Sequence, residues 1–239
     1  MKELSLTLKE KRWSSLIILL MYFVFGQYVI SFIYSLFLKL LNIQMSIIEI
    51  NSWFNLFYDA FMLLLATFLY RDYIKKSLQA IKGKYLRLTI WSITIGFIII
   101  YFANVVSGVI VQLMSPGSTS ANQDSLELML KFCKFPILMT AIFIGPILEE
   151  FVFRVAIFRN IYDYNRILAY LCSGLCFGFV HIQQALFAGQ LEQLFYLLPY
   201  GFLGIVFCYL YEKKGTLYVP IVVHIANNFV SMMISLSMI

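Results

Sequence analysis

The sequence predicts an all-α membrane protein: a polytopic helical bundle of about seven transmembrane helices with an amphipathic helix at the membrane surface. Of its 239 residues, 62% are hydrophobic and only 13% are charged, and the mean hydropathy is +0.85. A soluble domain has about 45–50% apolar and about 25% charged residues. Helices are the expected spanning elements, because backbone polar groups in lipid must bond within their own segment. Residues 1–239 are expected to form a single integral membrane domain.

Apolar runs long enough to cross a bilayer recur along the chain. They cover roughly residues 14–38, 52–70, 88–113, 127–157, 167–187, 193–211 and 216–237. The first run follows a charged stretch, is too long for a signal-peptide core and has no small-residue cleavage site after it, so a retained span is expected. The sequence contains no internal repeat and no low-complexity tract.

The basic residues predict how these spans are oriented. All but Lys39, Lys131 and Lys134 of the 18 Lys and Arg residues fall at the N-terminus or in the second, fourth and sixth connections. Cytoplasmic loops carry the excess of basic residues. We therefore expect an integral protein of a bacterial plasma membrane, with its N-terminus cytoplasmic and its C-terminus extracellular. The net charge of +6 belongs to these loops, so the lipid bilayer is the expected partner and nucleic acid is not.

Two connections have their own patterns. In residues 71–87, Ile74, Leu78, Ile81 and Tyr85 recur at helical spacing between basic residues. This predicts an amphipathic helix on the cytoplasmic surface, with a plain charged linker as the alternative. Residues 115–125 contain turn residues and no Lys or Arg, which predicts an external loop.

All the cysteines of the chain lie within apolar runs, at Cys133, Cys172, Cys176 and Cys208. Cys172 and Cys176 are four residues apart, which is not the CxxC spacing of a redox or zinc site. Buried free thiols are the expected state.

The fourth apolar run carries Glu149, Glu150 and Arg154 in the stretch GPILEEFVFR. Each charge costs on the order of 2.5–3.5 kcal/mol at a bilayer centre. Glu150 and Arg154 are four apart with the acid first, the favourable order for an ion pair along a helix. Glu149 points about 100° away around the helix and stays uncompensated. Pro146, just upstream, predicts a kink that opens space beside it.

The only histidines of the chain also lie in apolar runs. His181 follows Phe177 by four residues, and His224 precedes Asn228 by four. Either histidine alone is more often a hydrogen-bonding residue between helices. Polar groups in lipid converge on each other or on a water-filled cavity, so these residues and Glu149 predict three helices facing one cavity.

Depth and close packing bear on this arrangement. At about 1.5 Å per residue, Glu149 and His224 each lie about 15 Å from the inner edge, but His181 lies about 22 Å from it. The fifth span must therefore tilt or begin in the cytosol. Gly174 and Gly178 form a small-xxx-small pair in that span, which predicts close approach of a neighbouring helix.

These residues resemble the CAAX-protease and bacteriocin-processing (CPBP, or Abi) family of intramembrane glutamic proteases. Its pattern of EExxxR, FxxxH and HxxxN on successive membrane helices is matched over about 127–235, the motif-bearing core. The resemblance implies a metal-independent endopeptidase in which Glu149, aided by His181, activates a water. His224 and Asn228 would donate hydrogen bonds to the oxyanion, with Glu150, Arg154 and Phe177 in support.

The resemblance also implies a membrane-associated peptide or protein substrate and no cofactor. Peptide processing and bacteriocin immunity are roles of bacterial relatives. Zinc is a weaker alternative, because one Glu and two His can bind it but are scattered over three helices without HExxH. A non-proteolytic membrane regulator of the same fold and a proton-coupled transporter are also open, although the inverted repeats common in transporters are not evident.

Overall fold

A computed structural model describes residues 6–7 and 9–239, and within them all regular structure is helical. The all-α membrane prediction is confirmed. Six helical stretches are long and apolar enough to cross a membrane: Glu10–Leu40, Ile47–Leu69, Tyr85–Met114, Arg166–Phe187, Leu191–Lys214 and Tyr218–Met238. These correspond to six of the seven predicted spans.

Several spans combine α-helix with wider π-helical or tighter 3₁₀ turns. The N-terminal stretch comprises η2 (Glu10–Ser14), α1 (Ser15–Leu20), η3 (Met21–Phe25) and α2 (Gly26–Leu40). The next helices are α3 (Ile47–Leu69), α4 (Arg71–Ala80), α5 (Tyr85–Trp91), η4 (Ser92–Gly96) and α6 (Phe97–Met114). The C-terminal part comprises α11 (Arg166–Phe187), η7 (Leu191–Tyr196), α12 (Leu197–Lys214) and α13 (Tyr218–Met238).

The fourth predicted span, 127–157, is divided in the structure. Helix α7 (Ala121–Phe132) ends at Cys133, which has φ −144° and ψ 70°. A new helical run then starts, made of α8 (Lys134–Leu138), η5 (Met139–Ile144), α9 (Gly145–Glu149), η6 (Glu150–Arg159) and α10 (Asn160–Tyr162). The exposed Lys131 and Lys134 flank the break. The sequence prediction missed this break because it treated residues 127–157 as one continuous apolar run. We refer to residues 134–162 as the central helix.

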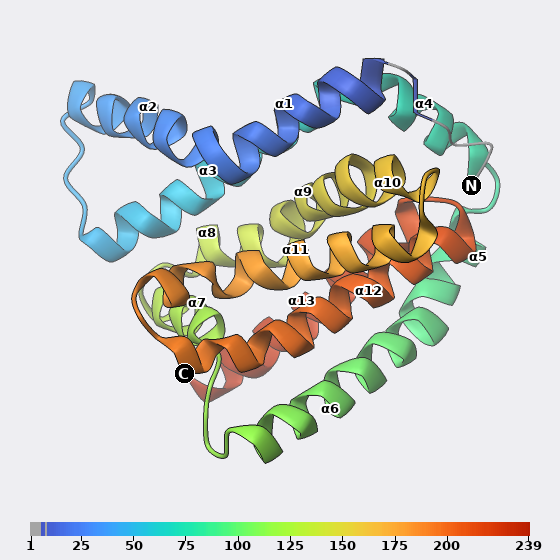
Figure 1. The fold of residues 1–239 in the computed structure, drawn as a ribbon. Helices are drawn as coiled ribbons and strands as arrows, with labels where there is room; N and C mark the ends of the chain where they lie inside the picture. Colours follow the sequence, from blue (N-terminus) through green and yellow to red (C-terminus); the bar gives the residue numbers. More distant parts are fainter. Residues whose placement is uncertain (1–5, 8) are drawn as a thin grey trace.

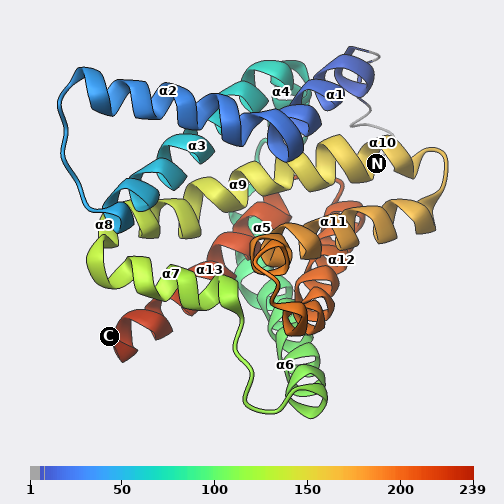
Figure 2. The ribbon, with the colours of Figure 1, turned by 60° about the vertical axis from the view of Figure 1, so that its left-hand side comes forward.

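The central helix lies in the middle of the bundle. Both ribbon views place it between the N-terminal helices α1–α3 on one side and α11–α13 on the other (Figures 1 and 2). All ten residues of η6 are buried, including its charged side chains. This position explains how charges are tolerated there, because protein and not lipid surrounds them.

Helices α11 and α12 approach each other through glycines. A Cβ at Gly178 would lie 2.8 Å from the backbone nitrogen of Gly201, and a Cβ at Gly204 would lie 3.0 Å from Cα of Gly174. The close approach predicted from Gly174 and Gly178 is therefore confirmed, with Gly201 and Gly204 as the matching residues of α12.

The surface helix is shorter than predicted, and it buries a different face from the predicted one. Helix α4 ends at Ala80, and Gly83 (φ 77°) makes the turn before α5. The buried side of the segment carries Tyr73, Ser77 and Ile81, whereas Leu78 is exposed. Tyr73 determines this phase, because its amide donates to Glu10 Oε1 at 2.7 Å and its hydroxyl pairs with the Tyr211 hydroxyl at 2.8 Å.

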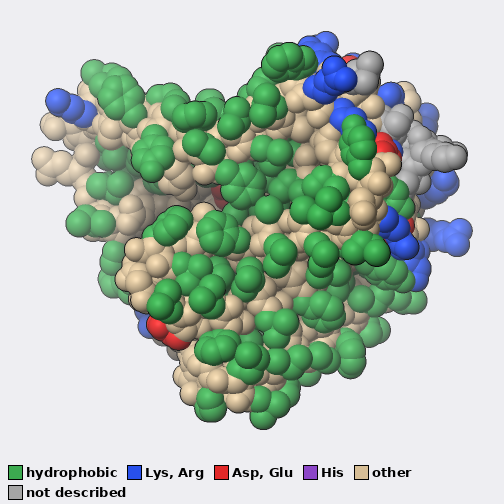
Figure 3. Space-filling model, in the orientation of Figure 1, with side chains coloured by type: hydrophobic (Ala, Val, Ile, Leu, Met, Phe, Trp, Pro, Cys, Tyr) green, Lys and Arg blue, Asp and Glu red, His purple; other side chains and the backbone are tan. Residues whose placement is uncertain are grey.

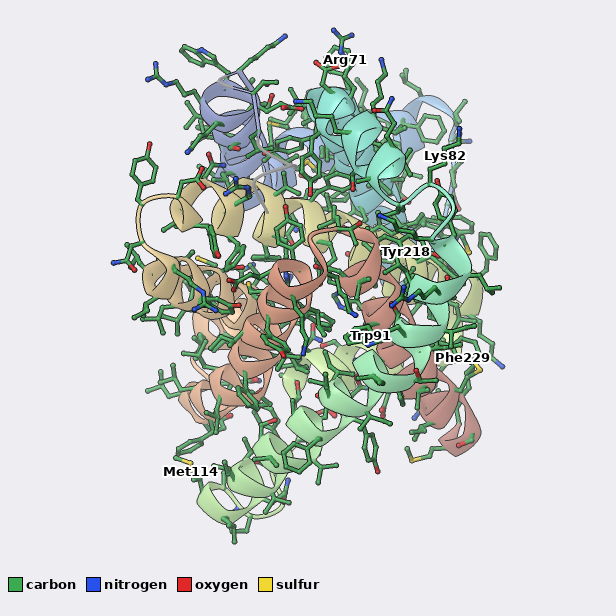
Figure 4. The ribbon with its side chains drawn as sticks, turned by 90° about the vertical axis from the view of Figure 1, so that its right-hand side faces the viewer. Arg71, Lys82, Trp91, Met114, Tyr218 and Phe229 are labelled. Carbon is green, nitrogen blue, oxygen red and sulfur yellow. The ribbon has the colours of Figure 1, made fainter. Side chains whose placement is uncertain are left out.

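Basic side chains gather at one end of the molecule. Figure 3 shows most of the visible Lys and Arg at one edge of this face and hydrophobic side chains over most of the remainder. In Figure 4, Arg71 and Lys82 lie at the end opposite to Met114. This asymmetry agrees with the predicted orientation, which stays a prediction; Lys2, also used for it, lies outside the described residues.

All four cysteines are free thiols. Only Cys208 is fully buried, where its thiol donates to the Ser173 hydroxyl at 3.2 Å, while the other three are partly exposed. The expectation of free thiols is thus confirmed, and that of burial holds for Cys208.

Candidate active site

Glu150 and Arg154 form the ion pair that their spacing predicts. Arg154 Nε lies 3.1 Å from Glu150 Oε2, and both side chains are completely buried. The contact lies off the N–H axis, so it is electrostatic and not a linear hydrogen bond. The guanidinium also lies 4.8 Å from the ring centre of Phe177 and 4.9 Å from that of Phe207. Desolvated cation–π contacts of this kind contribute about 2 kcal/mol, so the aromatic rings stabilise the buried cation.

His224 connects the two glutamates. Its Nδ1 lies 3.0 Å from Glu150 Oε1, and its Nε2 lies 3.6 Å from Glu149 Oε2. Because an ionised carboxylate only accepts hydrogen bonds, Nδ1 donates to Glu150 and Nε2 faces Glu149. A ring held in this way can donate from Nε2 only when both of its nitrogens carry a proton.

Glu149 is the acid without a settled partner. Its Oε2 is buried yet makes no hydrogen bond to the described residues, and 19% of its side chain is exposed. A partly accessible, unpaired carboxylate at the end of α9 is a suitable place for proton transfer.

His181 is near the site but does not touch either glutamate. Its Nδ1 lies 2.8 Å from the carbonyl oxygen of Phe177, which can only accept, so Nδ1 donates and Nε2 is left as an acceptor. The ring stacks on Tyr200 with centres 4.5 Å apart. Phe177 lies between the two imidazoles, 4.7 Å from His181 and 5.8 Å from His224. The phenylalanine of FxxxH is therefore the common wall of the site.

Asn228 is part of a chain of amides. Its Nδ2 donates to the Ala141 carbonyl at 2.8 Å, and its Oδ1 accepts from Asn227 at 3.1 Å. Asn227 in turn accepts from Asn104 of α6 at 2.8 Å. The second N–H of Asn228 has no partner among the described residues and is free to donate to a ligand. The sequence prediction missed Asn104 and Asn227, although both are amides inside apolar runs.

Asp59 of α3 is a further carboxyl at this site that the sequence prediction missed. A Cβ at Gly145 would lie only 3.3 Å from Asp59 Oδ2, and Gly145 is one helical turn before Glu149. The signal for this residue is a single acid in the middle of the second apolar run, where no motif draws attention to it.

A cavity of about 520 Å³ opens among α6, α7, α12 and α13, away from the basic end. It is lined by apolar residues and by several polar ones, with Glu127 as its only charged side chain. Tyr200, which stacks on His181, and Asn104, which begins the amide chain, both line it. Within the part of the chain that the structure describes, no three His, Cys, Asp or Glu side chains are grouped to hold a metal ion.

Comparison with known proteins agrees with this geometry. Residues 131–230 match the family model described as type II CAAX prenyl endopeptidase Rce1-like. The resemblance to the CAAX-protease and bacteriocin-processing family is confirmed. This matched region contains all the predicted site residues from Glu149 to Asn228, whereas Asp59 and Asn104 lie outside it.

Three curated proteins are similar to this chain over part of its length. The chain is 29% identical over 144 residues to the UPF0177 protein YvdC of Lactococcus lactis, covering 60% of this chain and 52% of the relative. It is 33% identical over 147 residues to YdiL of Bacillus subtilis, named as a candidate membrane peptidase, covering 60% and 55%. It is 29% identical over 143 residues to the membrane-embedded CAAX protease MroQ of Staphylococcus aureus, covering 58% and 54%.

The matched part thus spans about half the length of these relatives. No solved structure matches the chain.

Proposed function

We propose that this protein is an intramembrane endopeptidase in which Glu149 activates a water molecule without a metal ion. The observation that carries the proposal is the Glu149 carboxylate, which is partly exposed, makes no hydrogen bond to any described residue and lies 3.6 Å from His224. General bases contribute about 10²–10⁴-fold to such reactions. The family resemblance and the names of two relatives, a candidate membrane peptidase and a CAAX protease, support the same class of reaction.

The proposed reaction gives each of these groups a role. Glu149 takes a proton from water while the hydroxide adds to the carbonyl carbon of a peptide bond, with the unprotonated Nε2 of His181 as a second acceptor for the water. The carbonyl oxygen becomes an oxyanion and accepts a hydrogen bond from the free N–H of Asn228, and a second one from His224 Nε2 when both ring nitrogens of His224 carry a proton. Each such donor contributes about 2.7–4 kcal/mol in studied enzymes. Glu149 then returns its proton to the leaving amine as the carbon–nitrogen bond breaks.

The supporting residues keep this arrangement rigid. Glu150 orients His224 by accepting from Nδ1, and Arg154 balances the charge of Glu150. Phe177 contacts both imidazoles and the guanidinium. We propose the exposed side of Glu149 as the place where a membrane-associated peptide or protein enters, and the cavity at Tyr200 as a place for its extracellular part. Processing of bacterial peptides or their leaders, including bacteriocin immunity, is the proposed role.

The test compares membrane peptides from cells that carry the wild-type protein or Glu149→Gln, followed by cleavage of the identified peptide with purified protein. We expect Glu149→Gln and His181→Ala each to lower the cleavage rate at least about 100-fold. Glu192→Gln, an exposed glutamate of η7, is the matched control and keeps full activity. Cleavage that survives both Glu149→Gln and His181→Ala would contradict the proposal.

The two alternative functions predict different outcomes of the same comparison. A non-proteolytic regulator would keep its cellular effect after Glu149→Gln and produce no cleaved peptide. A proton-coupled transporter would give substrate-dependent ion flux in proteoliposomes, again without a cleaved product.

A further inference from the structure

Asp59 is a charged residue that the proposed mechanism does not use. It lies in the middle of α3, a candidate span whose other charged residue, Glu49, is explained by its capping box with Ser46. An acid at the centre of a span costs on the order of 2.5–3.5 kcal/mol. Asp59 is only partly buried, and among the described residues it makes no hydrogen bond and no ion pair that would offset this. Its position therefore requires another explanation.

Gly145 provides the space in which Asp59 approaches the helical turn that carries Glu149. Residues four apart lie on the same face of a helix, and side chains lean towards the helix N-terminus. The Glu149 side chain therefore leans over Gly145. A Cβ at Gly145 would lie 3.3 Å from Asp59 Oδ2, so Asp59 lies against the surface over which Glu149 is expected to lean.

The other groups around this gap do not neutralise the two acids. Arg154 is already paired with Glu150, and His224 donates its Nδ1 proton to Glu150. The phenols of Tyr22 and Tyr58, from η3 and α3, are the remaining titratable neighbours. His224 is a cation only while both of its ring nitrogens are protonated, and apart from it no second cation is paired with Glu149 or Asp59 in the described part of the chain. Two carboxylates that share a site of low dielectric do not both ionise.

We propose that Asp59 and Glu149 hold a single proton between them, so that Asp59 is a positioning residue acting through the catalytic glutamate. One carboxyl of the pair is then ionised and accepts the proton of water, while the other retains its proton. The pair titrates as a unit and not as two separate acids. Its catalytic consequence rests on the proposed protease function, but the proton sharing itself does not.

A carbodiimide tests proton sharing without any substrate. Dicyclohexylcarbodiimide adds the O–H of a protonated carboxyl across one of its C=N bonds, and the product rearranges to a stable N-acylurea. The full-length protein in nanodiscs is treated over a range of pH, and adducts at Asp59 and Glu149 are located by mass spectrometry. At neutral pH we expect one adduct per chain, on either residue, and none carrying both.

Substitutions make the result specific. In Asp59→Asn, Glu149 no longer has an acidic neighbour, so its labelling at neutral pH should fall about tenfold and its labelling curve should move to lower pH. Glu149→Gln should lower the labelling of Asp59 in the same way. Asp59→Glu restores a carboxyl and should restore most of the Glu149 labelling, whereas Glu192→Gln should change nothing. Near-ultraviolet circular dichroism confirms that each variant is folded.

Two outcomes would overturn the proposal. One is unchanged labelling of Glu149 in folded Asp59→Asn, and the other is simultaneous labelling of both residues in one chain at neutral pH. If the labelling results are as expected but no peptide is cleaved, the protease proposal fails and the shared proton stands.

Discussion

The N-terminal helices and the central helix have similar apolar sequences but opposite surroundings. On α2, Tyr28 is 77% exposed and Phe32 is 69% exposed, as expected for side chains that face lipid. On η6 every residue is buried, and the Glu150–Arg154 pair is completely so. Hydropathy alone does not distinguish a helix that faces lipid from one that is buried among other helices. The charges do, because a helix that carries paired ions inside a membrane protein must be surrounded by other helices.

The largest expected effect comes from breaking the ion pair of the central helix. Arg154→Ala leaves Glu150 buried without its partner, which should destabilise the protein by about 3–5 kcal/mol. Unfolding in detergent with increasing denaturant measures the change. The exposed Arg71→Ala at the surface of α4 should change stability by less than about 1 kcal/mol. If Glu150→Gln combined with Arg154→Met is no more stable than Arg154→Ala, the buried-charge explanation is wrong.

A pair of phenylalanines tests the comparison directly. Phe153 is completely buried in η6 against Tyr22 and Phe177, so Phe153→Ala should destabilise by about 3 kcal/mol or more. Phe32→Ala on α2 should stay within about 0.5 kcal/mol, as for other exposed positions. Both are measured by the same unfolding assay. Equal losses at the two positions would mean that α2 packs against a partner and does not face lipid.

The contact of α11 with α12 predicts a smaller effect. Gly178→Ala places a methyl group 2.8 Å from the Gly201 nitrogen, and overpacking of this kind costs about 1–3 kcal/mol. Gly108→Ala in α6 is the matched control, because a Cβ there meets nothing within 4 Å. It should be neutral or stabilise the helix by up to about 1 kcal/mol. Comparing Gly178→Ala with Gly108→Ala measures how much more tightly the core is packed than the periphery. If Gly178→Ala did not change stability, α11 and α12 would be able to move apart.

The smallest expected effect lies at the basic end. Asp163 contacts Lys11 at 3.2 Å and Arg159 at 2.5 Å. Partial burial alone would raise the pKa of Asp163, but the hydrogen bonds from Arg159 and Lys11 outweigh it and lower that pKa. The stabilisation is therefore present above the ordinary aspartate pKa and is lost as pH falls through the lowered value. Because Asp163 is half exposed, Asp163→Asn should cost less than about 1 kcal/mol at pH 7.

The measurement for Asp163 is the stability difference between wild type and Asp163→Asn as a function of pH. It should shrink towards zero as the solution becomes strongly acidic. A difference that persists there would show that the amide disturbs packing and not the ion pairs.

Local spacing was enough to predict part of the fold and of the candidate site. The Glu150–Arg154 pair follows from the i, i+4 rule, and the approach of α12 follows from Gly174 and Gly178. The unpaired state of Glu149 follows from its angle around the same helix. Each of these depends on one helix alone or on small residues whose effect is the same whichever helix packs against them.

Contacts between distant helices could not be predicted in this way. The spacing of Ile74 and Leu78 gave the wrong phase for α4, because a hydroxyl pair with Tyr211 decides it. Asp59 reaches the site only because α3 crosses the central helix at Gly145. The sequence placed His181 deeper in the membrane than Glu149 and predicted that its helix tilts. In the structure, His181 contacts Phe177 and makes no contact with Glu149.

Two polar contacts join α13 to the central helix. Asn228 binds the carbonyl of Ala141, and one turn earlier His224 binds Glu150. Both contacts depend on the number of residues between Ala141 and Glu150, which include the wide turns of η5. Natural variants should therefore tolerate substitutions in this stretch far better than insertions or deletions. A single added residue would shift Ala141 relative to Glu150, so that α13 could no longer make both contacts.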